Sequence, residues 1–146
     1  MTTISVFFND REIINNSTQQ LNQVQFTPMI YINNPEPNAL YTILLTDPDA
    51  PYPDNPVYAD FLHWMIINVT GTIPSTEHGM NIVTFIPSTP FRGNFHRYIF
   101  TLYKQTQRRV NIPFIYTQRR NFNTQQFITM NNLVHIDSVM YRTRTN

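Results

Sequence analysis

Two histidines and two aspartates have the residue types and the spacing to bind a small anion. His63 lies near the start of one apolar run of sequence and His96 opens another, while Asp47 and Asp49 follow directly after a third run. An imidazole donates hydrogen bonds to phosphate oxygens, more strongly when it is protonated, and a nearby carboxylate holds the ring in one tautomer. If the three runs are neighbouring strands, these side chains meet at one end of a sheet. The residues therefore predict a small pocket for a phosphate-type anion.

The same residues leave other kinds of site open. A single histidine near a strand end is more often structural, and residues 47–49 (Asp-Pro-Asp) are also typical of a turn in which an aspartate caps its own loop. Two histidines and a carboxylate can form an open zinc site, but the usual close spacing of two histidines is missing. We therefore expect no metal and no cofactor. A carboxylate in the pocket could also contact the amine of a zwitterionic headgroup.

The sequence argues against catalysis, and we expect no catalytic residues. The chain has no cysteine and no Gly-x-Ser-x-Gly turn, and its three glycines are too far apart for a phosphate-binding loop. Asp47 and Asp49 are too close in sequence to lie on opposite sides of a sugar. A hydrolase that uses His63 with a carboxylate as a base is an alternative, although no nucleophile accompanies it.

Strands are the elements that must position these side chains. Aromatic residues make up 14% of the chain, which favours strands, because aromatic side chains suit a half-buried pleated surface. Four prolines between residues 48 and 56 exclude a strand or helix there, and residues 15–20 and 33–38 are also loop-like. Apolar or β-rich runs predict strands at residues 3–8, 24–32, 41–46, 61–69, 81–86, 96–105 and 134–141.

One short helix is predicted late in the chain, at residues 125–131. Asn123 and Thr124 have the side chains of a helix N-cap, and Phe127, Ile128 and Met130 belong to the expected apolar face. One short helix among many strands predicts a mainly β fold.

Length and composition indicate a single domain over residues 1–146. At 41% hydrophobic residues, a chain of this size can bury a sizeable core. No apolar run approaches the roughly 18 residues that a membrane-spanning helix needs, and the first residues lack the features of a secretory signal. We therefore expect a cytoplasmic protein without a transmembrane segment, with peripheral membrane contact left open.

Charge is unevenly distributed along the chain, although the net charge is only +1. Up to residue 91 there are eight acidic residues and only Arg11 is basic, whereas the rest of the chain has nine basic residues and only Asp137 is acidic. Such asymmetry can mark a nucleic-acid surface. It also arises when both halves interleave in one sheet, which we favour, so we do not expect nucleic acid as a partner.

Three motifs in order resemble the phosphatidylethanolamine-binding protein (PEBP) family, which includes the Raf kinase inhibitor proteins and plant floral regulators. The first is residues 47–51 (Asp-Pro-Asp-Ala-Pro) with residues 61–64 (Phe-Leu-His-Trp). The second is residues 92–98 (Arg-Gly-Asn-Phe-His-Arg-Tyr), and the third, residues 120–124 (Arg-Asn-Phe-Asn-Thr), is similar to the plant branch. The resemblance extends in matching order from about residue 5 to residue 141.

The resemblance implies a mainly β PEBP-like fold, in which a large antiparallel sheet packs against a smaller sheet with one or two short helices. It also implies which residues form the pocket. The ligand-binding residues would be Asp47, His63, Pro90, His96 and Tyr98, with Asp49 and Arg97 as supports of the pocket.

For function, the resemblance implies a non-enzymatic module that binds a phosphate or phospholipid-headgroup anion such as phosphoethanolamine. Family members act largely as modulators, so we expect a protein partner such as a kinase, a protease or an adaptor, of unknown identity. The alternative is a structural or scaffold protein that keeps the fold without binding a ligand.

Overall fold

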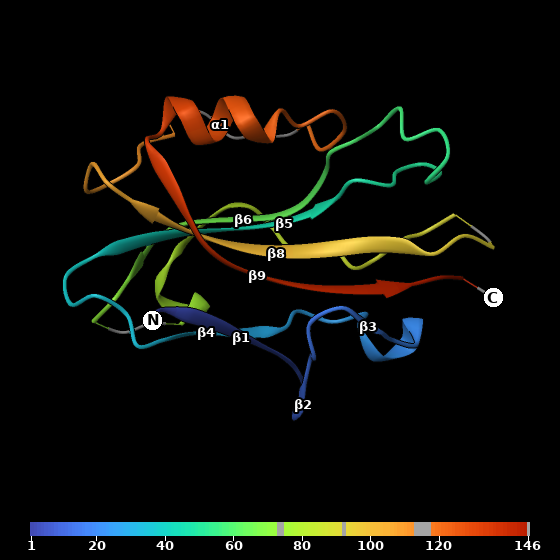
Figure 1. Ribbon diagram of the computed structural model, residues 1–146, viewed down its shortest axis with the longest axis horizontal. Helices are drawn as coiled ribbons and strands as arrows, with labels where there is room; N and C mark the ends of the chain where they lie inside the picture. The colour runs from blue at the N-terminus through green and yellow to red at the C-terminus, as the bar shows by residue number, and fades with distance from the viewer. Residues whose placement is uncertain (73–74, 92, 113–117, 146) are drawn as a thin grey trace.

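Over the residues that the computed structural model describes (1–72, 75–91, 93–112 and 118–145), six strands form one large sheet (Figure 1). In spatial order they are β3 (Ser17–Thr18), β9 (Leu133–Thr143), β8 (His96–Gln105), β5 (Leu40–Asp47), β6 (Phe61–Thr70) and β7 (Met80–Val83). Neighbouring strands are antiparallel, except that β3 pairs parallel with β9. The expected antiparallel sheet is thus mixed, because a two-residue strand from the predicted 15–20 loop joins its edge.

A smaller sheet covers one face of the large sheet, and a short helix covers the other (Figure 1). In the smaller sheet, β1 (Thr3–Phe8) lies between β2 (Arg11–Glu12) and β4 (Met29–Asn33). The helical elements of the described residues are the 3-10 turns η1 (Leu21–Gln23) and η2 (Thr76–His78) and the helix α1 (Thr124–Met130). The mainly β fold with a large and a smaller sheet is confirmed.

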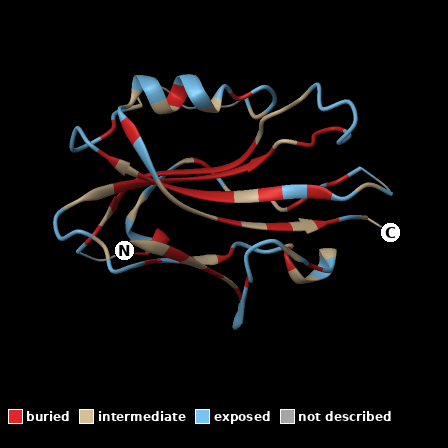
Figure 2. Cartoon of the chain, viewed as in Figure 1, coloured by how far each residue is buried: buried red, intermediate tan, exposed pale blue. Residues whose placement is uncertain are grey.

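Apolar side chains between the two sheets form the main core. β1 alternates along its length, so that Ile4, Val6 and Phe8 are buried while the residues between them are only partly covered. The ring of Phe8 packs edge-on against Phe100 of β8 and Tyr141 of β9, with ring centroids 6.3 and 5.9 Å apart. Figure 2 shows that most buried residues follow the strands, while exposed residues lie mainly in the connecting loops and on the helix. Alternation within β1 therefore fixes which face of the smaller sheet meets the large one.

Helix α1 begins and packs largely as its sequence predicts. The Asn123 side chain caps it by accepting a hydrogen bond from the backbone N–H of Gln126 at 3.0 Å. Phe127 is buried, but Met130 is 72% exposed, so the prediction that Met130 belongs to the apolar face is wrong. A seven-residue helix makes only about two turns, and its apolar contact comes from Phe127 and the partly buried Ile128.

Two predicted strands are shorter than expected. The 24–32 run becomes a strand only from Met29, because Val24 closes η1 and Pro28 has no N–H to donate to a ladder. The 81–86 run ends as a strand at Val83. Ile86 nevertheless stays beside β6, since its backbone N–H donates to the His63 carbonyl at 3.1 Å. This contact matters for the site described below.

The antiparallel order of the large sheet brings three strand ends together. β5 ends at Asp47, β6 begins at Phe61 and β8 begins at His96. Both β6 and β8 pair antiparallel with β5, so their first residues lie beside its last ones. Polar residues that are far apart in the sequence therefore meet at one edge of the sheet.

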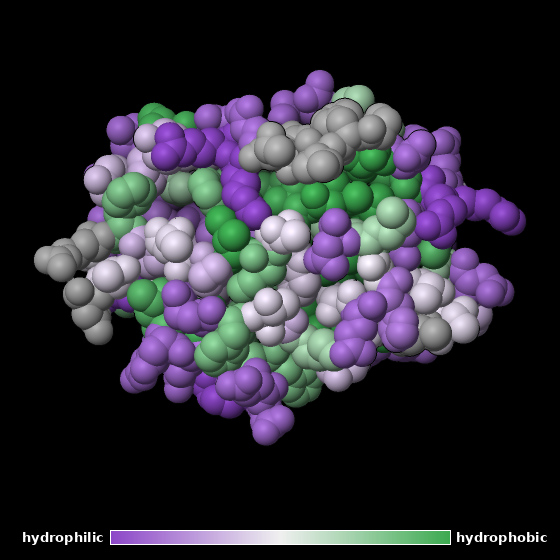
Figure 3. Space-filling view, turned by 180° about the vertical axis from the view of Figure 1, so that it is seen from behind, coloured by the Kyte–Doolittle hydropathy of each residue, from purple (hydrophilic) through white to green (hydrophobic). Residues whose placement is uncertain are grey.

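Early and late strands interleave in the large sheet, so the uneven charge along the sequence does not correspond to two separate halves of the fold. The late strands β8 and β9 lie between the early strands β3 and β5, so the basic and acidic halves of the chain share one sheet. Hydrophilic residues lie along much of the outline of the reverse face (Figure 3). Among the described residues, no helix is both long enough and apolar enough to cross a bilayer.

Candidate functional site

A cavity of about 630 Å³ opens at the meeting point of the three strand ends. Four of the five predicted ligand-binding residues line it, namely Asp47, His63, Pro90 and His96. The rest of its described wall consists of Leu21, Gln25, Ala50, Tyr58, Phe61, Ser88, Thr89, Phe91, Arg120 and Thr145. The cavity therefore combines two imidazoles and a guanidinium with aromatic side chains.

His96 and Asp47 form a buried pair at the cavity. The Nδ1 atom of His96 lies 2.7 Å from Oδ2 of Asp47, and both side chains are almost fully buried. The other oxygen of Asp47 accepts a hydrogen bond from the backbone N–H of Asp49 at 2.7 Å. A carboxylate only accepts hydrogen bonds, so this pairing places the Nδ1 proton on His96. Its Nε2 atom is buried and has no hydrogen-bond partner among the described residues.

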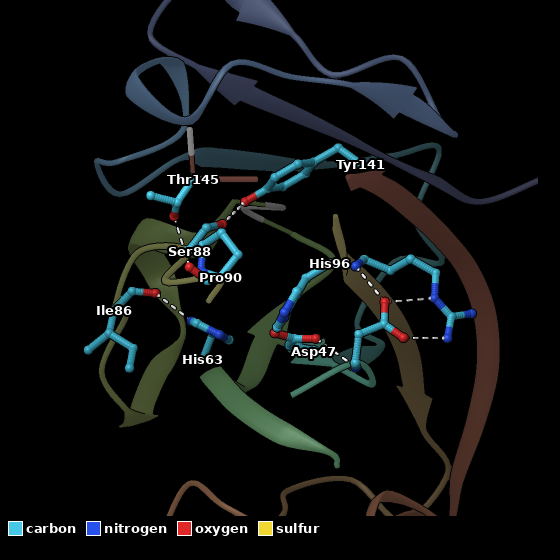
Figure 4. Close-up of polar contacts among 10 residues, drawn as sticks. Asp47, His63, Ile86, Ser88, Pro90, His96, Tyr141 and Thr145 are labelled. Atoms are coloured by element: carbon cyan, nitrogen blue, oxygen red, sulfur yellow. Dashed lines mark hydrogen bonds and ion pairs between the residues drawn. The ribbon is translucent and has the colours of Figure 1, made fainter. Parts of the chain in front are cut away.

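His63 is oriented in the same way by a different partner. Its Nδ1 atom lies 3.0 Å from the backbone carbonyl of Ile86, which can only accept, so Nδ1 carries the proton of the neutral ring. Burial lowers the pKa of His63, and the Ile86 hydrogen bond and the charge of Asp47 offset this only in part. His63 is therefore a neutral imidazole at neutral pH. Figure 4 shows the two imidazoles side by side, with Ile86 beyond His63 and Asp47 beyond His96.

A β-bulge places His63 in this position. Leu45 of β5 pairs with Trp64 of β6, whereas the next residue, Thr46, pairs with Leu62. β6 therefore has one extra residue at this step, and that residue is His63. Bulges re-aim a side chain and are frequent beside functional sites. The ring thereby gains contacts with Phe61, whose centroid is 4.9 Å away.

Asp49 and Arg97 brace the loop that follows β5. Asp49 accepts hydrogen bonds from the Arg97 backbone N–H at 2.8 Å and from Nε and Nη2 at 3.0 and 2.9 Å. Burial by itself would raise the pKa of Asp49, but the hydrogen bonds and charge of Arg97 outweigh it, so that the pKa is lowered. The structure thus places both residues beside the cavity, and neither lines it.

The loop that carries Pro90 is held by the end of β9 and its continuation. Thr145 Oγ1 donates to the Pro90 carbonyl at 2.8 Å, and Gly93 N–H donates to the Thr145 carbonyl at 3.2 Å. Ser88 Oγ and Tyr141 Oη are 2.6 Å apart (Figure 4). One wall of the cavity therefore depends on residues about fifty positions later in the sequence.

Tyr98, the fifth predicted ligand-binding residue, lies behind the cavity wall. Its ring is fully buried, stacks on His96 at 6.3 Å and meets the edge of His63 at 5.3 Å. Two residues along a strand correspond to about 7 Å, so Tyr98 faces the same side as His96 but one step deeper. Burial raises the pKa of Tyr98 far above its ordinary value, so the phenol stays neutral. Tyr98 supports both imidazoles from behind.

Arg120 is a wall residue that sequence reasoning did not assign. Its guanidinium lies 4.0 Å above the ring of Tyr58, and it is the one lysine or arginine among the described residues of the wall. Its neighbour Arg119 instead donates to the backbone carbonyls of Leu62, His63 and Thr84. The motif at residues 120–124 was the sequence signal that could have indicated Arg120 as a wall residue. However, no local feature of the sequence distinguishes Arg120 from Arg119.

The described residues of the cavity do not form a cluster of metal ligands. Within the described part of the chain, no three His, Cys, Asp or Glu side chains form a group that could hold a metal. Asp47, the one carboxylate in the wall, already uses both oxygens in hydrogen bonds to His96 and Asp49. The groups left for a ligand are the Nε2 atoms of His63 and His96 and the guanidinium of Arg120.

The chain is thus a mainly β protein of two packed sheets, with a histidine-lined cavity at the strand ends of the larger sheet. The family model for Phosphatidylethanolamine-binding protein matches residues 3–136, so the chain belongs to this family. It is 33% identical over 133 residues to FLOWERING LOCUS T of Arabidopsis thaliana, with 90% of this chain and 73% of that protein covered. TERMINAL FLOWER 1 of the same plant is 32% identical over 126 residues, covering 86% of this chain and 70% of that protein.

Solved structures show the same fold at lower identity. A phosphatidylethanolamine-binding protein from Plasmodium vivax matches with a TM-score of 0.82 and 18% identity, over 99% of this chain and 86% of that one. A carboxypeptidase Y inhibitor, solved in complex with its cognate proteinase, matches with a TM-score of 0.80 and 20% identity, over 99% and 84% of the two chains. At these identities the likeness establishes the fold alone.

Proposed function

We propose that this chain is a non-enzymatic binding module that holds a phosphate-type anion, such as phosphoethanolamine, in the cavity at His63 and His96. The observation that carries the proposal is the geometry of the two rings. Each ring has its Nδ1 atom engaged by the protein, at Ile86 and Asp47, which leaves Nε2 as the ligand atom. Arg120 adds a cation to the same wall.

The proposed mode of binding follows from these donors. A guanidinium donates charge-assisted hydrogen bonds to phosphate oxygens, which are roughly twice as strong as neutral ones. A neutral imidazole with its proton on Nδ1 offers only a lone pair at Nε2, so the His63 ring must take up a proton before it donates to an anion. Binding of an anion is therefore coupled to protonation of His63.

A scaffold without ligand binding and a hydrolase are the competing functions. The open cavity, with a buried and unpartnered Nε2 atom on His96, favours a ligand over a scaffold. The hydroxyl of Ser88 is the candidate nucleophile in the wall, and it is hydrogen-bonded to Tyr141 at 2.6 Å. An active serine needs a base within hydrogen-bonding reach, so this geometry favours binding over hydrolysis.

In this proposal the bound state modulates a partner protein in the cytoplasm. Two kinds of relative support a regulatory role. The similar plant proteins are named for flowering, and a carboxypeptidase Y inhibitor shares the fold. A kinase, a protease or an adaptor protein is accordingly the class of partner to seek.

A titration with phosphoethanolamine tests the binding function directly. We expect saturable NMR shifts at His63 and His96, with no change at the exposed His78 and His135. Replacing Arg120→Gln should weaken binding about tenfold or more, since a hydrogen bond to a charged group contributes about 1.5–3 kcal/mol. Arg108→Gln, at an exposed arginine outside the cavity, is the matched control and should bind normally. No shift at millimolar ligand would contradict the proposed function.

A further inference from the structure

A second hollow, of about 700 Å³, lies beside β3 and the 3-10 turn η1. Its described lining consists of Thr18, Gln19, Gln20, Leu21, Asn22, Gln25, Phe95 and Arg144. Leu21 and Gln25 also line the anion cavity, whereas the two histidines and Arg120 line that cavity alone. In Figure 1, β3 and the turn after it lie near the end of β9 and the C-terminus. The second hollow therefore presents its own set of side chains to a ligand.

The hollow lies at an edge of the large sheet, where an extended chain can dock. β3 is the outermost strand on this side, and within the described chain β9 is its only partner strand. Thr18 of β3 lines the hollow. The outer side of an edge strand has backbone N–H and C=O groups without a partner strand, and extended peptides add to sheets at such edges. This position favours a polypeptide as the ligand.

Side-chain amides in the lining complement the backbone of such a peptide. Gln20 and Asn22 are exposed, and neither amide has a hydrogen-bond partner among the described residues. Gln25 is held in place, because its Nε2 donates to the Ser88 carbonyl at 3.0 Å. Each amide places a carbonyl acceptor beside an N–H donor, which matches the N–H and C=O groups of a peptide. The free amides of Gln20 and Asn22 are therefore available to bond a docked chain.

Arg144 gives the hollow a positive charge. Its guanidinium carbon lies 4.6 Å from the centroid of the Phe95 ring, and Phe95 is 40% exposed. No Asp or Glu belongs to the described lining. A guanidinium that stacks on a ring keeps its N–H edges free for carboxylate oxygens. The charge of the lining therefore favours an acidic ligand.

Two further arginines flank the hollow and bond to neutral groups. Arg11 donates to Gln19 Oε1 at 3.1 Å, and Arg142 donates at 2.8 Å to Oδ1 of Asn16, which lies just before β3. Within the described chain, neither of them nor Arg144 forms an ion pair with a carboxylate. Charge complementarity across an interface steers a partner of the opposite sign to such a surface. The carboxylates that these arginines lack inside the protein are groups that a partner can supply.

A membrane or a nucleic acid fits this edge less well than an acidic peptide. Lipid surfaces are bound by clusters of about four to eight lysines and arginines, and three arginines lie here. Single-stranded nucleic acid stacks its bases on aromatic rings, but Phe95, the one aromatic residue of the described lining, already has Arg144 over its face. A carboxylate needs only one guanidinium, which it binds through two hydrogen bonds.

We propose that the second hollow and the free edge of β3 dock an extended acidic segment of a partner protein. The carboxylates of the segment bind Arg144 and the two neighbouring arginines, and its backbone bonds to the amides of Gln20 and Asn22. This inference goes beyond the proposed function, because the docking needs no anion in the cavity at His63 and His96.

The test compares two capped pentapeptides on the full chain, Thr-Glu-Thr-Glu-Thr and its neutral counterpart Thr-Gln-Thr-Gln-Thr. The two glutamates lie on the same side of an extended chain, because side chains alternate along a strand. NMR titration of the side-chain amides of Gln20 and Asn22 measures both affinities. We expect the glutamate peptide to bind at least about fivefold more tightly, since charge-assisted hydrogen bonds are roughly twice as strong as neutral ones. Equal affinities would overturn the inference.

Paired arginine variants locate the site of docking. Arg144→Gln should weaken binding of the glutamate peptide about fivefold or more, because it removes a charge-assisted partner. Arg108→Gln removes the same charge from an exposed arginine beyond the other end of β8, and should change the affinity less than about twofold, since salt screens distant charges. Both side chains are exposed, so both variants should fold. Equal losses in the two variants would mean that net charge alone attracts the peptide, which would overturn the inference.

A competition experiment separates this docking site from the anion cavity. The glutamate peptide should bind with unchanged affinity in the presence of excess phosphoethanolamine, and displacement of one by the other would place both in the same cavity and overturn the inference. Tighter binding of oligothymidylate or of phosphatidylserine vesicles than of the glutamate peptide would also overturn it. Failure of phosphoethanolamine to bind, with the glutamate peptide still bound, would contradict the proposed function and support the separate docking site.

Discussion

At the scale of single residues, the directions of two imidazole rings decide the chemistry of the cavity. His63 donates its Nδ1–H to the Ile86 carbonyl and His96 donates its own to Asp47, so Nε2 is the ring nitrogen left for a ligand in both residues. A neutral Nε2 is an acceptor, and an anion needs a donor. In the proposed function, anion binding and proton uptake by His63 are therefore linked.

The first prediction concerns the pH dependence of that linkage. Burial places the pKa of His63 below its ordinary value in the free protein, and a bound anion raises it. Binding thus takes up protons, so affinity is highest below the free pKa and falls with rising pH, by at most about tenfold per pH unit for each proton taken up. Isothermal titration with sulfate, which does not titrate in this range, should show this fall between pH 5 and 8.

His63→Gln provides the comparison for this prediction, because it removes the titrating ring. The variant should take up fewer protons on binding than the unchanged protein. This uptake is measured from the difference in binding enthalpy between two buffers that have different ionisation enthalpies. A flat affinity profile from pH 5 to 8 in the unchanged protein would exclude the proposed proton linkage.

Local sequence identified the charged and aromatic residues of this edge but not the depth at which each would lie. Asp47, His63 and His96 were placed correctly at strand ends, because apolar runs end where polar residues begin. Tyr98 was expected on the cavity wall, yet one further step of the strand puts it in the core. Arg120 was not assigned, since its contact with Tyr58 spans two loops.

At the scale of elements, a bulge in β6 and a braced loop after β5 hold the cavity open. At the bulge, the His63 carbonyl accepts a hydrogen bond from the Ile86 N–H, and the His63 Nδ1–H donates to the Ile86 carbonyl. These two hydrogen bonds connect the segment after β7 to the site. Asp49 fastens the proline-rich loop to β8 through three hydrogen bonds with Arg97. Asp49 thus anchors the loop to β8, beside other contacts such as the hydrogen bond from the Tyr58 N–H to the Ala50 carbonyl at 2.9 Å.

The second prediction, at this scale, is that Asp49→Asn destabilises the protein by about 1.5–3 kcal/mol, the range for hydrogen bonds to a charged group. Arg97 lowers the pKa of Asp49, so this stabilisation is present above the unfolded value near 4 and is lost as pH falls through the lower folded value. Urea unfolding at pH 7 and at low pH should show a difference between the two proteins that shrinks with acidification.

Asp54→Asn, at an exposed aspartate in the same loop, is the control and should leave the urea midpoint unchanged. Equal midpoints for the Asp49 variant and the unchanged protein would mean that the loop is held by other contacts.

At the scale of the whole molecule, the core between the two sheets determines whether the cavity exists. The cavity wall includes Leu21 and Gln25, from the segment between the smaller sheet's strands β2 and β4, as well as residues of β5, β6 and β8. Docking of the smaller sheet onto the large one therefore completes the site. Phe8 lies at that junction, in edge-on contact with Phe26, Phe100 and Tyr141.

The third prediction is that Phe8→Ala lowers the free energy of unfolding by about 3–5 kcal/mol, the usual cost of removing a buried phenyl ring. Phe7→Ala, one residue away on the opposite face of β1, should cost clearly less, because that ring is only partly buried. Urea unfolding of both variants measures the difference. Similar losses in the two variants would show that the sheets are held together elsewhere.

The sequence by itself determined the kind of protein and the position of most strands. β1 and β8 were predicted with their observed bounds, because alternation and apolar runs are local patterns that need no partner strand. The ordered motifs also indicated the family that the family model matches over residues 3–136.

Only the tertiary structure decided which atoms face the ligand. The parallel pairing of β3, the bulge at His63 and the depth of Tyr98 all depend on the register between strands that lie far apart in the sequence. The meeting of Arg120 with the two histidines likewise depends on long-range packing. Side-chain direction in a sheet changes with every one-residue shift of register, and register is set by the partner strands, so no local pattern contains it.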